Sequence, residues 1–320
     1  MAKAETLIVA DIGGTNTRVA LVEGGTLSTD TIRKFPNAEY PGLERVLADF
    51  VDHVGGGPIA GACVAVAGPV RDGTATLTNL DWGIDSGTVK RPTGAARVAV
   101  LNDLQAQGHA IGRIAPDNLK EILTASSGPR QGPSLVIGVG TGFNCAPVHD
   151  YPGGRLVTAA EAGHVNLPIR NQSDLSLAEF VGTVHGFPAI EDVLSGRGLE
   201  RIYAWLGHRD GTPAEARAAD IMAACADRSD PRAGEAAETF IRILGTVAGN
   251  LALIHLPFGG IYMAGGVARA FLPYYRDMAF GDAFRDKGRF AGFMGNFSVS
   301  LIDDDFAALL GCAAHLSRLA

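Results

Sequence analysis

The stretch VADIGGTNTR, from Val9 to Arg18, ends a short apolar run with a carboxylate, Asp11. A buried charge must be paired or must bind a cation. Glycines let a backbone approach a ligand closely, and consecutive N–H groups form an anion-binding nest. A carboxylate beside such a nest suits Mg²⁺ that bridges phosphate oxygens, although the same turn residues are also common in ordinary hairpins. These turn residues are Gly13, Gly14, Thr15 and Asn16.

The residues after this turn predict a second strand, Val19–Glu23, so the motif is a hairpin. A Rossmann or P-loop unit would instead continue into a helix. The same format returns downstream, where the strand Leu135–Val139 leads into Gly140-Thr141-Gly142 and then into another apolar run from Cys145. Two such hairpins predict a duplicated core, with two similar α/β halves that face a cleft.

Further short apolar runs, each ending in glycine, Asn or Asp, are typical of strands covered on both faces of a sheet. They are Leu7–Ala10, Ala62–Ala67, Val98–Leu101 and Ile261–Ala264. Helices are predicted between them, from the three- and four-residue spacing of apolar positions and from flanking Pro and Gly. The expected helices cover residues 42–54, about 231–256 and about 305–319.

The composition indicates a folded globular chain that is long enough for two cores. The chain has 320 residues, of which 47% are apolar and 19% charged. A net charge of −7 without a basic block argues against nucleic-acid binding, which needs a basic face. We see no signal peptide and no long apolar run that predicts a transmembrane helix, so we expect a cytoplasmic protein without a membrane partner.

Metal and redox motifs based on cysteine are absent from the sequence. Cys63, Cys145, Cys225 and Cys312 are widely separated and form no Cys-x-x-Cys pair. A zinc site needs several nitrogen or sulfur ligands, so we expect free thiols and no zinc. The chain also lacks Gly-x4-Gly-Lys-Ser/Thr, and residues 138–142 fail the Gly-x-Gly-x-x-Gly spacing. Neither a P-loop enzyme nor a dinucleotide enzyme is favoured.

The ordered motifs resemble those of the ATP-dependent bacterial glucokinase family, within the actin-like sugar kinases. Asp-x-Gly-Gly-Thr-Asn-x-Arg is similar to their first phosphate motif, residues 140–142 to the second, and residues 261–266 to the adenosine motif. Leu101-Asn102-Asp103, Glu161-Ala162-Gly163-His164 and the Glu-x-x-x-Ser-Gly segment from Glu191 resemble the sugar-binding motifs. Residues 287–290 resemble a stretch near the C-terminus of that family.

The resemblance implies a two-domain, actin-like (ribonuclease H-like) α/β sugar kinase fold with a duplicated core and an interdomain cleft. We expect a small domain of residues 1–112 plus 304–320 and a large domain of residues 113–303. ATP and Mg²⁺ are the implied cofactors, and Asp11 is expected to hold Mg²⁺ directly or through water. The implied ATP-binding residues are Asp11, Gly13, Gly14, Thr15, Asn16, Gly140, Thr141, Gly142, Gly265 and Gly266.

The resemblance also implies that Asp103 is the general base for a sugar hydroxyl, which is a poor nucleophile until a carboxylate accepts its proton. From the residues alone, Asp103 could equally cap a helix, and Glu191 could be an ordinary residue on a helix surface. The implied hexose-binding residues are Asn102, Asp103, Glu161, His164 and Glu191.

Two positions depart from the family pattern. Asn144 stands where the second phosphate motif usually has glycine, and we expect it to keep the left-handed backbone that asparagine tolerates. Ala162 replaces another usual glycine, and its methyl group is expected to shift the hexose slightly.

The implied reaction is transfer of the γ-phosphoryl group of ATP to the 6-hydroxyl of glucose. A kinase for another hexose or related sugar is the first alternative, because the same residues would serve it. A sugar-sensing regulator without turnover is the second. Regulatory relatives carry an N-terminal helix-turn-helix, for which the first strand, beginning by Thr6, leaves no room. We also expect a homodimer.

Overall fold

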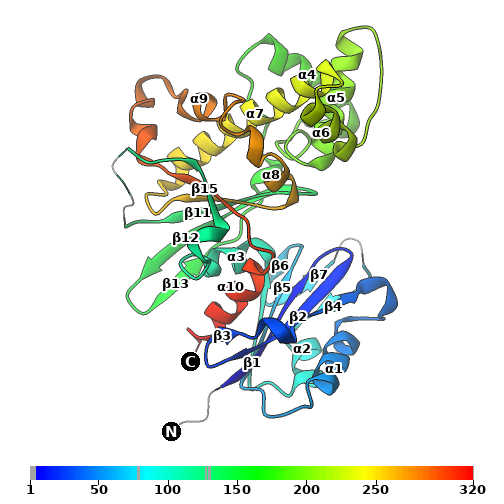
Figure 1. Ribbon diagram of the computed structural model, residues 1–320, viewed down its shortest axis with the longest axis vertical. Coiled ribbons are helices and arrows are strands. Elements are labelled where there is room, and N and C mark those ends of the chain that lie inside the picture. The colour runs from blue at the N-terminus through cyan, green and yellow to red at the C-terminus, as the bar shows by residue number, and fades with distance from the viewer. Residues whose placement is uncertain (1–4, 78–79, 127, 129–130, 320) are drawn as a thin grey trace. The chain divides into compact units, whose positions relative to one another are not determined.

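The computed structural model describes residues 5–77, 80–126, 128 and 131–319, and the chain forms two compact units (Figure 1). Unit 1 comprises residues 1–116, 151–159 and 304–320, and unit 2 comprises residues 117–150 and 160–303. Each unit combines helices with a sheet that has both parallel and antiparallel pairs. The fold is therefore α/β.

The main sheet of unit 1 has the order β3-β2-β1-β5-β9, with β4 also pairing with β2. Strand β1 runs antiparallel to β2 and parallel to β5, and β5 runs parallel to β9. The strands are β1 (Thr6–Ile12), β2 (Asn16–Glu23), β3 (Thr26–Leu27), β4 (Arg33–Pro36), β5 (Gly61–Val66) and β9 (Arg97–Asn102). A small second sheet contains β6 (Val70–Arg71), β7 (Thr74–Thr76) and β8 (Gly83–Ile84).

Helices cover both faces of the main sheet in unit 1. Side chains alternate along β1: Ile8 and Ile12 belong to the apolar cluster that includes helix α1, whereas Leu7 and Val9 pack in the cluster that includes helix α10. Burial on both faces explains why β1 has a continuous apolar run instead of an alternating pattern. The helices are α1 (Leu43–His53), α2 (Ser86–Thr93), α3 (Asp103–Ala110) and α10 (Ala307–Leu316).

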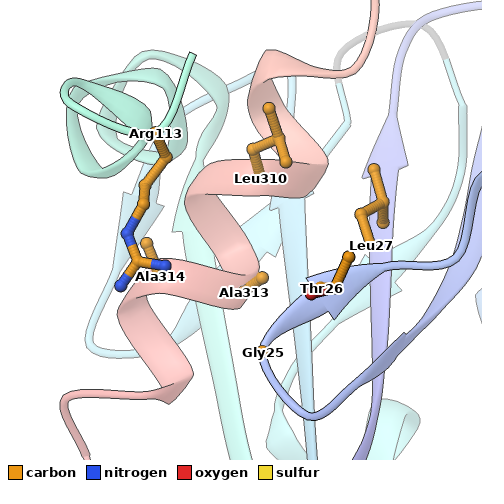
Figure 2. A pocket seen from close by; sticks show the side chains of 7 residues that line it. All are labelled: Gly25, Thr26, Leu27, Arg113, Leu310, Ala313 and Ala314. Atoms are coloured by element: carbon orange, nitrogen blue, oxygen red, sulfur yellow. The ribbon is translucent and has the colours of Figure 1, made fainter. Parts of the chain in front are cut away.

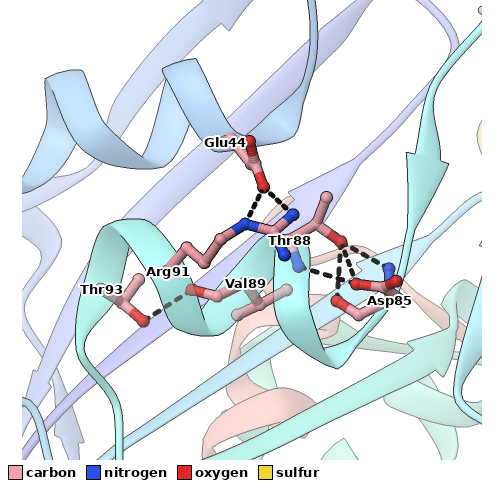
Figure 3. Close-up of polar contacts among 6 residues, drawn as sticks. All are labelled: Glu44, Asp85, Thr88, Val89, Arg91 and Thr93. Carbon is pink, nitrogen blue, oxygen red and sulfur yellow. Dashed lines mark hydrogen bonds and ion pairs between the residues drawn. The ribbon is translucent and has the colours of Figure 1, made fainter.

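Polar contacts fix α2 against α1 (Figure 3). The N–H of Thr88 donates to Asp85 Oδ1 at 2.7 Å, and the N–H of Asp85 donates to Thr88 Oγ1 at 2.6 Å, which is a capping box. One turn further on, Arg91 Nε donates to Glu44 Oε1 at 2.6 Å. Both ends of α2 are thereby fixed, and the apolar face of the helix covers β5 and β9.

The sheet of unit 2 includes the strands β10-β15-β14-β11-β12, in that order. Strand β11 runs antiparallel to β12 and parallel to β14, and β14 runs parallel to β15. A hairpin followed by two parallel strands is the order that unit 1 also has in β2-β1-β5-β9. The strands are β10 (Leu119–Leu123), β11 (Ser134–Val139), β12 (Phe143–Tyr151), β14 (Ile261–Ala264) and β15 (Val299–Ile302).

Strand β13 (Gly154–Val157) belongs to unit 1, and the Arg155 guanidinium donates to main-chain oxygens at the end of α3. The distances from Arg155 Nη1 are 3.0 Å to the oxygen of Gly108 and 2.7 Å to that of Ile111. In addition, Gln105 Nε2 donates to the oxygen of Val157 at 2.9 Å.

Short 3₁₀ helices complete the fold: η1 (Thr29–Thr31), η2 (Asn37–Glu39), η3 (Pro116–Asn118), η4 (Ala162–His164), η5 (Leu272–Tyr274), η6 (Gly288–Phe290) and η7 (Phe293–Asn296).

Helix α7 is the central helix of unit 2. Its N-cap is Asp230, Pro231 occupies its first turn, and Phe240 stacks on Phe271 with ring centroids 4.6 Å apart. By length and composition α7 is apolar enough to cross a membrane, but 67% of its most apolar window is buried inside the protein, as in the core helix of a globular domain. The helices of unit 2 are α4 (Gln172–His185), α5 (Gly196–Arg209), α6 (Ala218–Asp227), α7 (Pro231–His255), α8 (Gly266–Ala270) and α9 (Phe280–Arg285).

The strands and helices named from the sequence are confirmed, with ends that differ by a few residues. Leu7–Ala10 extends to Thr6–Ile12, and the last helix is shorter than expected, at Ala307–Leu316. Helices α4 to α6 and the small sheet of unit 1 were not predicted. Strands as short as those of the small sheet carry too few residues for a periodic pattern.

Candidate active site

The turn between β1 and β2 places Asp11 at the carboxyl end of a buried strand. The N–H of Gly13 donates to the oxygen of Asn16 at 3.0 Å, which closes the turn. Asp11 lies opposite Arg18, and Arg18 Nη1 is 3.7 Å from Asp11 Oδ2. Burial raises the pKa of Asp11, while the charge of Arg18 acts to lower it. This long ion pair leaves the carboxylate able to bind a further cation.

A residue that the sequence analysis missed, Asn37, holds this turn in place. Its side chain is 1% exposed, its Oδ1 accepts from Thr17 Oγ1 at 2.8 Å, and its Nδ2 donates to the oxygen of Gly13 at 2.8 Å. Its own N–H donates to the oxygen of Thr15 at 2.9 Å. In the sequence, Pro36-Asn37 reads as an ordinary turn pair, so no local signal pointed to this role.

Replacing Asn37 by Ala is expected to lower the free energy of unfolding by about 2 kcal/mol or more, because it leaves the buried Thr17 hydroxyl and the half-buried Gly13 oxygen without this partner. Urea titration followed by circular dichroism measures the change. Asn250→Ala, at an exposed position of α7, is the control and should change stability by no more than about 0.5 kcal/mol. Equal stability of the two variants would show that Asn37 does not support the turn.

Asn102 and Asp103 lie where β9 ends and α3 begins. Asn102, and not Asp103, is the N-cap: its Oδ1 accepts from the N–H of Leu104 at 3.0 Å, and its Nδ2 donates to the oxygen of Gly68 at 2.9 Å. The Asn102 side chain also accepts from the backbone of Gln105 in a capping box and hydrogen-bonds to the Asp103 carboxylate, so it holds the start of α3 and the proposed base together. Asp103 is the first residue of α3, and its Oδ1 also accepts from the N–H of Leu104, at 2.9 Å.

The structure brings Asp11 and Asp103 to the same edge of the sheet in unit 1. Strands β1 and β9 both run parallel to β5, and Asp11 and Leu101 both pair with Ala65. Burial, and to a lesser degree the charge of Asp11, raise the pKa of Asp103 to about 6. A carboxylate with that pKa is ionised at neutral pH and is a better proton acceptor than an ordinary aspartate.

In unit 2 the second glycine-rich turn packs against the end of β14. Gly265 has a φ of 101°, and a Cβ there would overlap the main-chain oxygen of Val139, so no other residue fits without a shift. The N–H of Gly196, at the start of α5, donates to the oxygen of Gly140 at 2.9 Å. The predicted nucleotide residues 140–142 and 265–266 therefore lie together.

Three predicted sugar-binding residues gather where β12 begins. The N–H of Phe143 donates to Glu191 Oε2 at 2.9 Å, and a Cβ on Gly142 would overlap this carboxylate. Glu191 precedes α5, so the alternative that it is a helix-surface residue is wrong. His164 Nε2 lies 4.0 Å from Glu161 Oε2, and both side chains are about two-thirds exposed, at 67% and 64%.

The predicted site residues thus form one group in each unit. Unit 1 holds Asp11, the turn from Gly13 to Asn16, Asn102 and Asp103. The remaining residues, all in unit 2, are Gly140, Thr141, Gly142, Glu161, His164, Glu191, Gly265 and Gly266.

The prediction of a left-handed backbone at Asn144 is wrong. Asn144 has a negative φ within strand β12, and its side chain hydrogen-bonds to the loop that carries Glu161. Ala162 is 8% exposed and packs in the apolar core of unit 2, so its methyl group is buried there. Neither position requires glycine. Asn144 lies in an extended strand and Ala162 packs in the core, and both environments accept a side chain.

Among the described residues, no group of three or more His, Cys, Asp or Glu side chains has the arrangement of a metal site. A pocket of about 180 Å³ in unit 1 is lined by residues of β3 and α10 and by Arg113 (Figure 2). Ligand pockets usually measure about 300–1,000 Å³, so this pocket is too small for a nucleotide. It contains none of the predicted site residues.

A family model described as Glucokinase matches residues 8–319. The glucokinase of Saccharophagus degradans is 34% identical over 316 residues, which cover 98% of each chain. The chain belongs to the glucokinase family. Among solved structures, a glucokinase from an Antarctic psychrotroph has a TM-score of 0.88 and 27% identity, with 98% of this chain and 99% of that chain covered. A ROK-family glucokinase from Streptomyces griseus, solved with glucose and AMPPNP, shares the fold, with a TM-score of 0.60, 22% identity and 98% and 100% coverage.

Proposed function

We propose that this member of the glucokinase family transfers the γ-phosphoryl group of ATP to the 6-hydroxyl of glucose, releasing ADP and glucose 6-phosphate. The observation that carries this proposal is the family match over residues 8–319. The Streptomyces griseus enzyme of the same fold, which was solved with glucose and AMPPNP, supports this pair of substrates.

In the proposed mechanism Asp103 accepts the proton of the 6-hydroxyl as the hydroxyl oxygen bonds to the γ-phosphorus, and the bond from that phosphorus to the bridging oxygen of ADP breaks. The pKa of Asp103, raised to about 6, suits this role because the group is ionised at neutral pH yet still basic. Asn102, which hydrogen-bonds to the Asp103 carboxylate, is the proposed neighbour of the base at the sugar. Glu161, His164 and Glu191 are the proposed partners of the other hydroxyls.

We assign the nucleotide to the turn Gly13–Asn16 with residues 140–142 and 265–266. The donor set fits Mg²⁺, because this ion usually takes one or two protein carboxylates and completes its shell with phosphate oxygens and water. Asp11, whose ion pair with Arg18 is long at 3.7 Å, is the carboxylate that would hold it. Magnesium, arriving with ATP, supplies charge neutralisation on the transferred phosphoryl group.

The same proposal includes a duplicated core with an interdomain cleft, and domains of residues 1–112 plus 304–320 and 113–303. The matching strand orders β2-β1-β5-β9 and β12-β11-β14-β15 support the duplication. A homodimer, a cytoplasmic location and the absence of zinc also belong to the proposal.

A panel of hexoses tests the substrate. Glucose is expected to exceed its 2- and 4-epimers, mannose and galactose, by at least about tenfold in kcat/KM, equivalent to about 1.4 kcal/mol, because a displaced hydroxyl leaves a site carboxylate unpaired. Coupled ADP release measures the rates, and reactions without sugar give the background. Values within about twofold for all three sugars would leave a hexose kinase but remove the preference for glucose.

Activity is expected to fall as the pH drops through about 6. Because the pKa of Asp103 is raised, the base is ionised above that value and protonated below it, so the loss is on the acid side. The kcat/KM for glucose, measured from about pH 5 to about pH 8, should show this acid limb. A profile that stays flat through pH 6 would remove Asp103 as the titrating base.

A further inference from the structure

Asn144 connects the glycine-rich turn of unit 2 to the loop that carries Glu161. It is the second residue of β12 and is separated from the turn of residues 140–142 only by Phe143. Its Nδ2 donates to Glu161 Oε2 at 3.3 Å. Its Oδ1 accepts from the N–H of Cys145 at 2.8 Å and from the N–H of Ala162 at 3.0 Å. One carboxamide therefore contacts both the backbone and the carboxylate of the Glu161 loop.

The backbone gives no reason for asparagine at this position. Asn144 lies in an extended strand, where asparagine is a disfavoured residue. It does not have the positive φ for which asparagine is often selected. The side-chain contacts are therefore what distinguishes asparagine from other residues here.

A hydrogen bond that restricts the rotamers of Glu161 favours ligand binding. Its side chain is 64% exposed, and its neighbour His164 lies 4.0 Å away, at the limit of an ion pair. An exposed glutamate samples several rotamers, and ordering it when a ligand binds reduces affinity. The hydrogen bond from Asn144 reduces that cost before the ligand arrives. The carboxylate keeps further lone pairs for sugar hydroxyls.

We propose that Asn144 is a positioning residue for hexose binding, which orients the Glu161 carboxylate through Nδ2 and sets the affinity of the site for the sugar. This inference rests on the proposed function and deepens it. Asn144 acts through Glu161 and not on the reacting atoms. Its removal therefore affects sugar binding more than phosphoryl transfer or nucleotide binding.

The variant that isolates this role is Asn144→Asp. The aspartate retains an oxygen that accepts from Cys145 and Ala162, so the backbone contacts persist. It replaces the N–H donor to Glu161 with an oxygen, which introduces repulsion between two carboxylates. We expect the KM for glucose to rise about 3- to 10-fold, the cost of ordering one free side chain, with the KM for Mg·ATP and kcat changed by less than about twofold.

The double variant Asn144→Asp with Glu161→Gln restores the hydrogen bond with donor and acceptor exchanged. If the inference is correct, Asn144→Asp costs sugar affinity in the wild-type background and costs little in the Glu161→Gln background, so the two changes are not additive. This comparison requires that the single and double variants share one melting temperature. Asn250→Asp, an exposed position of α7, controls for the added negative charge and should match the wild type.

Calorimetric titration of glucose into the nucleotide-free protein supplies a readout that is independent of turnover. Weaker glucose binding by Asn144→Asp in the wild-type background, with little further weakening in the Glu161→Gln background, supports the inference. Additive effects in the cycle, or equal glucose affinity of wild type and Asn144→Asp, overturn it while the proposed function stands. A wild type that neither binds nor phosphorylates glucose overturns the proposed function itself. If Asn144→Asp does not fold, Asn144→Ser answers the same question, because a serine at this position cannot reach Glu161 and should weaken glucose binding to a similar extent.

Discussion

Replacing Asp103 by Asn is expected to reduce kcat by on the order of 10²–10⁴ while the protein stays folded, because this is the usual loss when a general base is removed. The amide has the same shape and can still accept from the N–H of Leu104, which Asp103 Oδ1 does now at 2.9 Å. It cannot accept the proton of a sugar hydroxyl. Initial rates at saturating glucose and Mg·ATP measure the effect.

The matched control for this variant is Asp52→Asn, an exposed residue of α1 that loses the same charge. It should retain wild-type kcat. Glucose binding by the Asp103→Asn variant, measured by calorimetry, separates loss of the base from loss of the site. Wild-type turnover in Asp103→Asn would show that another group accepts the proton.

Replacing Asp11 by Asn is expected to lower kcat/KM for Mg·ATP by on the order of 10²-fold, comparable to the loss of one preorganised electrostatic contact to a transition state. Glucose affinity should change by less than about twofold, because the residue is assigned to the metal and not to the sugar. Steady-state kinetics with varied Mg·ATP, together with calorimetric glucose titration, give both values. A fall in glucose affinity with unchanged kinetic parameters for Mg·ATP would mean that Asp11 belongs to the sugar site and not to the nucleotide site.

The pH profile of Asp11→Asn adds a second check. The charge of Asp11 raises the pKa of Asp103, so its removal should lower that pKa and move the acid limb of kcat/KM for glucose to lower pH. An unshifted limb would show that the two carboxylates do not interact in the free enzyme.

Much of the fold could be predicted because its core strands are buried on both faces. A run such as Leu135–Val139 is wholly buried in the structure, and that burial demands continuous apolar residues. The first strand of each hairpin and the long helix α7 carry equally clear local signals. The signal fails for short strands such as Val70–Arg71, where position in the sheet and not periodicity decides the conformation.

The sequence reveals a residue whose type is demanded by local backbone geometry, but it does not reveal a contact that is made across the chain. Glycines at 142 and 265 stand where a Cβ would overlap a neighbouring group, and the sequence shows them directly. Asn37 was missed because the atoms that it binds lie on the turn between β1 and β2, well before it in sequence. Asn144 was assigned to a left-handed turn because its partners, Glu161 and Ala162, are distant in the chain.

The sequence by itself determined the order of strands and glycine-rich turns, the placement of Asp11 and Asp103 at strand ends, and the family. These properties follow from residue type and spacing, because backbone freedom and burial are local demands. Only the tertiary structure decided that Asn102 and not Asp103 caps α3, and that Asp11 helps to raise the pKa of Asp103. It also decided that Asn144 holds Glu161. Hydrogen bonds and charge interactions depend on distances of a few ångströms, and for residues far apart in the chain those distances exist only after the strands have paired.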